Sequence, residues 1–336
     1  MHEFNMKAAE AEFNRSFEKA WNDTISKYDS NQAQLTEGSH LRPLMVFWGY
    51  IAAVSAPHIS SQTMKIDYIA DVAVSIELIH KATILIDDWI DEDRARHGKN
   101  AFHVEYGPYY TVILALHMIS DSIIKLKAFL PLDIKAHNNY YICSDILANT
   151  IYSMSKGALE ELKLESNRFN LEHIKEIAKL ETAEIIGNAL QLGYFAGLGD
   201  NINDSNLLKY TGIRFGYLFQ VMNDMEAFAD QDSLITHKGN LNDDVNISRK
   251  NVAVALLYNI ASKHDKTIVA NGSYSDIVKL MNKYKVLDFV VSETELFYSK
   301  IIEDYQKSTF EKTWISNFII FMQDAKTKAY QKLGLT

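Results

Sequence analysis

The distribution of proline limits this chain more than any other feature of its sequence. All four prolines lie in the first 131 of 336 residues, and the last is Pro131. Because proline is the residue that interrupts helices most strongly, nothing after that point forces a helix to end. Apolar residues recur there at helical spacing, as at Ile174, Ile177, Leu180 and Ala183. We therefore predict an all-α fold with long helices.

No internal repeat, low-complexity tract or long polar linker divides the chain, and no alternating pattern stands out as a β-hairpin. We predict a single helical domain over residues 1–336. Helix breaks are predicted where glycine, proline and small polar residues gather. These ranges are 36–38, 57–61, 98–108, 130–133, 197–205, 237–246 and 271–275.

Composition excludes several classes of protein. A single cysteine, Cys143, cannot form an internal disulfide, and a formal charge of −9 argues against a general nucleic-acid binder. The first residues contain no apolar signal-peptide core, and the apolar stretches are too short or too charged to span a membrane. We expect a cytoplasmic protein without a membrane span.

Two apolar segments run directly into acidic residues. Val72–Ile86 is followed by Asp87, Asp88 and Asp91, and the first and last of these share a face if the helix continues. Like charges at this spacing repel each other, and negative charge is unfavourable at the C-terminal end of a helix. A divalent cation between the carboxylates would reverse this cost, and oxygen ligands of this kind suit Mg²⁺. A solvated acidic helix end is the structural alternative.

The second apolar segment is Tyr210–Met222, which is followed by Asn223, Asp224 and Glu226. Alone, this cluster fits an acidic surface turn equally well. Together, two helices that each present acids at one end could hold metal ions on opposite sides of a cavity.

These residues resemble the trans-isoprenyl diphosphate synthases. The resemblance spans roughly residues 38–255, and its motifs occur in the family's order. They are Gly38-Ser39-His40-Leu41-Arg42-Pro43, Glu77 to Thr83, Asp87 to His103, Gly157 with Glu160-Glu161-Leu162, Glu181-Thr182-Ala183, Phe219 to Asp224, and Gly239 to Arg249.

The resemblance implies a helical bundle around a deep cavity, usually dimeric, and the Mg²⁺-dependent ionisation of an allylic diphosphate, with Mn²⁺ as a possible substitute. The ionised prenyl group would be attacked by the double bond of isopentenyl diphosphate. By the same resemblance, Asp87 and Asp91 would hold metal with Asp88 in support. Asn223 and Asp224 stand in the second metal motif. The implied substrate-binding residues are Arg42, Arg96, His97, Thr182 and Gln220, and Asp87, Asp91 and Arg96 would be catalytic.

The chain departs from the family pattern at several charged positions. Ser39 and His97 replace cations of the isopentenyl diphosphate pocket, and Glu181 and Asn240 replace lysines elsewhere. The second aspartate motif keeps Asp224 but begins with Asn223. Each lost cation removes a charge-assisted donor to phosphate.

Three functions therefore stay open. The first is a divergent chain-elongating synthase, which we favour. The chain could instead pass the prenyl cation to another acceptor, such as a peptide tryptophan, or cyclise it. Finally, it could be a non-catalytic subunit of a heteromeric synthase. A homodimer is expected for the first case and a heteromer for the last.

Overall fold

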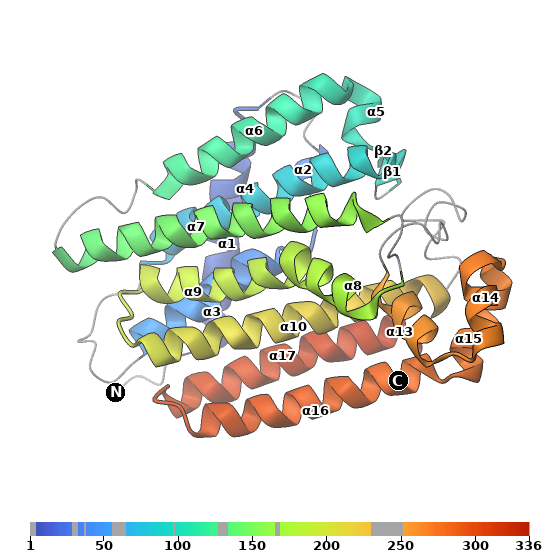
Figure 1. Cartoon of the computed structure of the whole chain (residues 1–336). Coiled ribbons are helices and arrows are strands. Elements are labelled where there is room, and N and C mark those ends of the chain that lie inside the picture. The colour runs from blue at the N-terminus through green and yellow to red at the C-terminus, as the bar shows by residue number, and fades with distance from the viewer. Residues whose placement is uncertain are drawn as a thin grey trace.

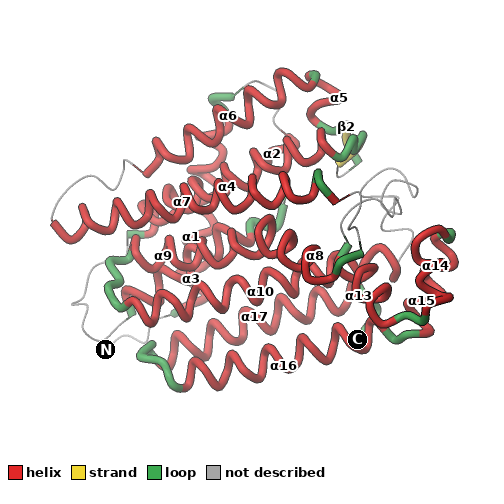
Figure 2. Tube along the Cα trace, viewed as in Figure 1, coloured by secondary structure: helices red, strands yellow, loops and turns green. Residues whose placement is uncertain are grey.

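Figure 1 shows the computed structural model of the chain, which describes residues 5–28, 33–36, 38–55, 65–96, 98–126, 134–164, 169–229 and 251–335. These residues are almost entirely helical, as Figure 2 shows, so the all-α prediction is confirmed. The expected breaks at 57–61, 130–133 and 237–246 lie outside the described residues. The breaks at 36–38, 197–205 and 271–275 coincide with helix ends.

The helices of the first half include those that carry the candidate site. Their bounds are α1 Met6–Ile25, α2 Ala33–Thr36, α3 Leu41–Val54, α4 Ile66–Ile90, α5 Phe102–Tyr106, α6 Pro108–Lys125 and α7 Ile134–Glu161. A two-stranded antiparallel hairpin, β1 Ala95–Arg96 with β2 Lys99–Asn100, follows α4. The sequence analysis did not predict this hairpin. Its strands are only two residues long, too short to show an alternating pattern.

The helices of the second half extend without proline, as predicted. Their bounds are α8 Leu171–Ala178, the π-helical segment η3 Lys179–Ala183, α9 Glu184–Ala196, α10 Ile202–Ala229, α13 Val252–Ile260, α14 Lys263–Asn271, α15 Tyr274–Lys283, α16 Val286–Gln306 and α17 Lys312–Lys332. Local signals set several of these starts. Asn170, Asn251, Ser262 and Ser273 each accept a backbone N–H of the helix that follows.

Helix α9 lies at the centre of the bundle, between α3, α7 and α10, while α6 covers α4 on the outside (Figure 1). Glycine allows the closest of these approaches. A Cβ at Gly49 of α3 would overlap the backbone carbonyl of Leu190, and one at Gly193 of α9 would overlap the carbonyl of Val46. The backbones of α3 and α9 therefore pack directly against each other.

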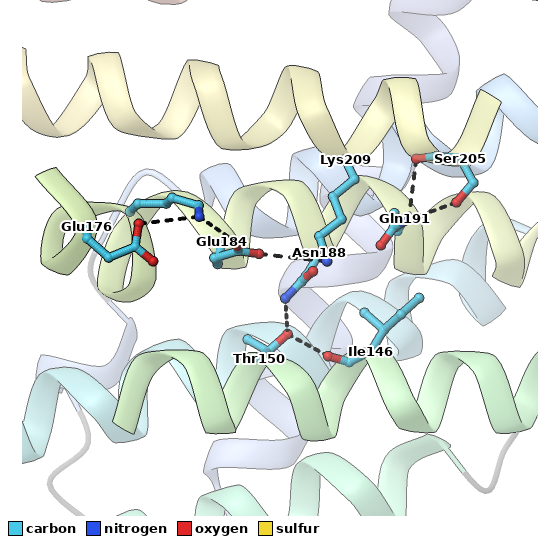
Figure 3. Close-up of polar contacts among 9 residues, drawn as sticks. Ile146, Thr150, Glu176, Glu184, Asn188, Gln191, Ser205 and Lys209 are labelled. Atoms are coloured by element: carbon cyan, nitrogen blue, oxygen red, sulfur yellow. Dashed lines mark hydrogen bonds and ion pairs between the residues drawn. The ribbon is translucent and has the colours of Figure 1, made fainter. Parts of the chain in front are cut away.

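Polar contacts hold α9 to its other neighbours (Figure 3). Buried Asn188 donates to Thr150 of α7 at 2.9 Å, and Gln191 donates to Ser205 of α10 at 2.9 Å. Lys209 of α10 lies 3.7 Å from Glu184. These contacts fix the rotation of α9 about its axis, because each one requires a particular face to point at a particular helix.

The C-terminal helices pack into the same hydrophobic core as the other helices. The buried residues of this one cluster range in sequence from Met6 to Leu333. The indole N–H of Trp314 donates to the carbonyl of Trp48 at 3.1 Å, and Tyr305 donates to Thr211 at 3.1 Å. Residues near the end of the chain thus support α3 and α10. Within the described ranges, no helix is long and apolar enough to cross a bilayer.

The close contact at Gly193 predicts that replacing this helical glycine with alanine lowers stability, although such a replacement usually raises it. Gly193→Ala should lower the free energy of unfolding by about 1–3 kcal/mol, because the added methyl group forces α3 and α9 apart. In an unconstrained helix the same change would raise stability by about 0.5–1 kcal/mol. Urea unfolding followed by circular dichroism measures the difference. Ser155→Ala, at an exposed position of α7, is the control and should change stability by less than about 0.5 kcal/mol. A Gly193→Ala protein at least as stable as wild type would contradict the packing argument.

Candidate active site

The first aspartate cluster lies on the last turn of α4. The helix continues beyond the apolar segment to Ile90, and the backbone N–H of Asp91 donates to the carbonyl of Asp87 at 2.8 Å. Asp87 and Asp91 are therefore one turn apart on one face, as the sequence predicted. Asp87 is exposed, Asp91 is half-buried, and Asp88 is buried with 3% of its surface exposed. The three carboxylates consequently differ in their access to solvent.

Asp88 forms a bidentate ion pair with Arg96. Nε of Arg96 donates to both carboxylate oxygens, at 2.8 and 2.7 Å, and a terminal guanidinium nitrogen contacts Oδ1 as well. Burial alone would lower the pKa of Arg96, but the hydrogen bonds and charge of Asp88, together with Asp87 and Asp93, raise it. The guanidinium is thus a permanent positive charge fixed beside the exposed aspartates.

A second charged group surrounds the start of α3. His40, which precedes the helix, has a left-handed backbone conformation with φ 47°, and its Nδ1 lies 3.2 Å from Oε1 of Glu77 on α4. Nζ of Lys81 lies 3.9 Å from the same oxygen. Glu77 and Lys81 are both buried. Opposite charges attract more strongly in such an environment than in water.

Arg42 lies within reach of this group. Burial lowers the pKa of its guanidinium, and the charge of Glu77 opposes that shift. Its Nε is buried and has no hydrogen-bond partner among the described residues. A buried N–H without an acceptor is costly, so an anionic ligand at this position would be stabilised by it.

His80 marks the place where these charges converge. Its pKa is well below the usual value, first because of burial and then because of the charges of Arg42, Lys81, Arg96 and His40. The charges of Arg42 and Arg96, two of the predicted residues, thus both act on His80.

The residues predicted in the second part of the site, on η3 and α10, form a hydrogen-bonded chain. Thr182 donates to Oε1 of Gln220 at 3.0 Å, and Nε2 of Gln220 donates to Asp224 at 2.7 Å. The second oxygen of Asp224 accepts the backbone N–H of Val252 at 2.6 Å, at the start of α13. Thr182 belongs to η3, and π-helical turns often occur at functional sites.

Other predicted residues are less involved or lie elsewhere. Asn223 is exposed on α10, which continues through the second motif rather than ending before it. His97 and the range 230–250 lie outside the described residues. Lys81 was missed by the sequence analysis, although a glutamate and a lysine four residues apart in an otherwise apolar helix are a recognisable sign of a buried ion pair.

The donor set at the end of α4 fits a magnesium ion. Asp87 and Asp91 offer carboxylate oxygens on one face, and Mg²⁺ commonly takes one or two carboxylates while waters and substrate phosphates complete its shell. Among the described residues, no group of three or more His, Cys, Asp or Glu side chains could hold a metal alone. Asp224 fits less well, because its oxygens already accept hydrogen bonds from Gln220 and Val252.

The sequence of the chain matches a known protein family. Residues 27–271 match the family described as polyprenyl synthetase. The chain belongs to the polyprenyl synthetase family. It is accordingly an enzyme of the prenyltransferase class, as its sequence motifs predicted.

Similar proteins cover most of the chain. The geranylgeranyl diphosphate synthase of Sulfolobus acidocaldarius is 25% identical over 84% of this chain and 84% of its own. Component 2 of the heptaprenyl diphosphate synthase of Bacillus subtilis is 24% identical over 80% of this chain and 67% of its own. The solved geranylgeranyl pyrophosphate synthase of Corynebacterium glutamicum, complexed with isoprenyl diphosphate and magnesium, aligns with a TM-score of 0.72, 17% identity and 98% coverage of both chains. This last likeness shows a shared fold.

The Asp88–Arg96 pair gives a stability prediction. Asp88→Asn should lower the free energy of unfolding by roughly 2–3 kcal/mol, because it leaves a largely buried guanidinium without its counter-charge. Asp71→Asn is the matched control. Asp71 pairs with Lys125 at 3.3 Å, but its side chain is 43% exposed, and this substitution should cost less than about 1 kcal/mol. Urea unfolding of both variants tests the difference, and equal costs would show that the buried pair does not anchor the hairpin.

Proposed function

We propose that this enzyme ionises an allylic prenyl diphosphate with the help of Mg²⁺ and transfers the prenyl group to isopentenyl diphosphate, giving a longer trans-polyprenyl diphosphate. The observation that carries the proposal is the arrangement at the end of α4. Two aspartates lie on one helical face there, beside an arginine fixed by Asp88. The names of the similar synthases support the same reaction class.

Each group has a role that follows from its chemistry. A diphosphate leaves only when its negative charge is neutralised. Mg²⁺, when bound by Asp87 and Asp91, would supply most of this neutralisation, and Mn²⁺ could replace it. Arg96 would donate to the same diphosphate. Thr182 and Gln220 would line the allylic site from the opposite side, where their mutual hydrogen bond fixes both side chains. A metal-binding role for Asn223 and Asp224 stays a prediction.

The acceptor would bind at the start of α3. Arg42 presents a buried N–H that has no acceptor among the described residues, and a second phosphate group would satisfy it. The charges that converge on His80 favour an anion in the same region. These features favour isopentenyl diphosphate over an uncharged acceptor. A peptide acceptor, cyclisation and a non-catalytic role are the outcomes against which the proposal is tested.

Turnover with defined substrates is the direct test. Purified protein should convert farnesyl or geranyl diphosphate and isopentenyl diphosphate into longer prenyl diphosphates, detected by mass spectrometry, and chelation with EDTA should stop the reaction. The Asp87→Ala, Asp91→Ala double variant should lose at least about 100-fold in rate, since metal stabilisation of the leaving group contributes several kcal/mol.

The control is Glu92→Asn. Glu92 is exposed next to the motif and has φ 57°, a conformation that asparagine tolerates, so this variant should keep wild-type activity. Undiminished turnover in the double variant would refute the metal site. Consumption of the allylic substrate without incorporation of isopentenyl diphosphate would refute the proposed acceptor. Activity that requires an added second synthase chain would identify a heteromeric subunit.

We also propose that the enzyme is a homodimer joined through α6 and α7. Half of the large apolar side chains exposed by the described residues lie on these two helices. Tyr109 and Ile113 on α6, and Tyr141, Tyr152 and Leu159 on α7, recur at helical spacing and are 57–89% exposed. Apolar stripes of this kind on a soluble surface mark interaction sites. Exposed apolar stripes on two helices that contact each other suit a second copy of the same chain.

Oligomeric state checks this proposal. Wild-type protein should have the mass of a dimer in light scattering after size-exclusion chromatography, and Ile113→Glu with Tyr152→Glu should give a monomer, because two buried carboxylates per chain would oppose association. Leu296→Glu is the control, since Leu296 is 65% exposed on α16, away from both stripes. A monomeric wild type would overturn the proposal, and a stable complex only with a different synthase chain would replace it with a heteromer.

A further inference from the structure

The loop before α3 lacks a cation that the family pattern has at Ser39, yet the structure places another ammonium group beside it. A Cβ built on Gly38, which has φ +138°, would lie 3.2 Å from Nζ of Lys81. Lys81 comes from the middle of α4, more than 40 residues further along the chain. Its ammonium therefore reaches the backbone immediately before the position where the cation is missing.

The surroundings of Lys81 suit a residue that meets an anion. The side chain is 7% exposed, and its Nζ lies 3.9 Å from Oε1 of Glu77. Nε of Arg42, which lies within the influence of the same glutamate, is buried without an acceptor in the described part of the chain. Lys81 on α4 and Arg42 on α3 thus both lie near Glu77, and Nε of Arg42 has no acceptor among the described residues.

Two further features point to the same group of residues. The charges of both Lys81 and Arg42 act on His80 and lower its pKa. Helix α3, 14 residues long, begins at Leu41 with no side-chain cap on its first turn. The uncapped N–H groups of a helix start attract anions. Each feature alone is weak, but Arg42 adds a buried donor without a partner at the same place.

We propose that Lys81 contributes the diphosphate-binding cation that Ser39 does not provide, so that Lys81 and Arg42 together bind the diphosphate of the acceptor substrate. This inference rests on the proposed function for the identity of the ligand. It makes Lys81 a substrate-binding residue, and it explains how the site can keep its charge although one motif position has lost it.

Binding without metal isolates this site from the aspartates of α4. Isothermal titration calorimetry with isopentenyl diphosphate, in the presence of EDTA, should show a Kd at least about 10-fold higher for Lys81→Met than for wild type, as expected for the loss of a charge-assisted contact. In turnover, the KM for isopentenyl diphosphate should rise by a similar factor. The KM for the allylic diphosphate should stay within about twofold. Inorganic diphosphate, titrated in parallel, reports whether the headgroup alone is recognised.

The decisive variant replaces the positive charge lost from Lys81 with a new one at position 39, on the loop before α3. Ser39→Lys in the Lys81→Met background should return the Kd to within about threefold of wild type, because the new ammonium would extend from the residue next to Gly38. Ser39→Lys alone should tighten binding by less than about threefold, since Lys81 already supplies the cation. This single variant leaves the buried residues intact and remains informative if Lys81→Met unfolds. Lys125→Met, which removes a partly exposed lysine paired with Asp71, should leave the Kd unchanged.

Several results would overturn the inference. The first is a folded Lys81→Met protein with an unchanged Kd, and the second is a 10-fold gain from Ser39→Lys alone. The third is loss of binding that Glu77→Gln restores and Ser39→Lys does not, because Lys81 would then only balance Glu77. If wild type binds isopentenyl diphosphate through Lys81 but does not elongate with it, the proposed function fails and the inference holds. If wild type binds neither isopentenyl diphosphate nor inorganic diphosphate, the inference fails, whatever its activity on allylic substrates.

Discussion

The buried pair between Asp88 and Arg96 is the contact on which the candidate site depends. It joins the last turn of α4 to the hairpin that follows, and it fixes a guanidinium in the same part of the chain as exposed Asp87 and half-buried Asp91. The pair offsets part of the mutual repulsion of the three aspartates at this helix end. One acid of the motif thus positions a cation, while the other two keep the roles proposed for them in metal binding.

The sequence predicted the fold class and the helical spacing of Asp87 and Asp91 well, because both depend on local patterns. The absence of proline after Pro131 and the apolar run before Asp87 follow directly from residue order. The hairpin at Ala95–Asn100 and the π-helical turn at Lys179–Ala183 could not be predicted in this way. Their geometry is set by tertiary contacts, such as the pair with Asp88 and the hydrogen bond between Thr182 and Gln220.

The charged residues around the start of α3 show a second reason why function cannot be predicted from motifs one position at a time. Because Ser39 and His97 stand where the family pattern has cations, the sequence suggested a weakened binding site for the acceptor substrate. In space, the ammonium of Lys81 lies beside Gly38, and the charges of Arg42 and Arg96 also act on His80. Electrostatic complementarity depends on where a charge lies and not on which residue carries it. A substitution that removes a charge from a motif can therefore be offset from a different helix.

The two sides of the candidate site differ in a way that bears on how it holds its ligands. On the α4 side, Asp87 and Asp91 occupy the end of a helix, where negative charge is unfavourable unless a cation is present. On the α10 side, Asp224 is already stabilised by Gln220 and by the backbone N–H of Val252 at the start of α13, where negative charge is favourable. By the helix-dipole argument alone, a bound cation would offset more unfavourable charge at the end of α4 than at Asp224. A site with this asymmetry would take its metal mainly from α4 and use α10 to orient the substrate through Gln220 and Thr182.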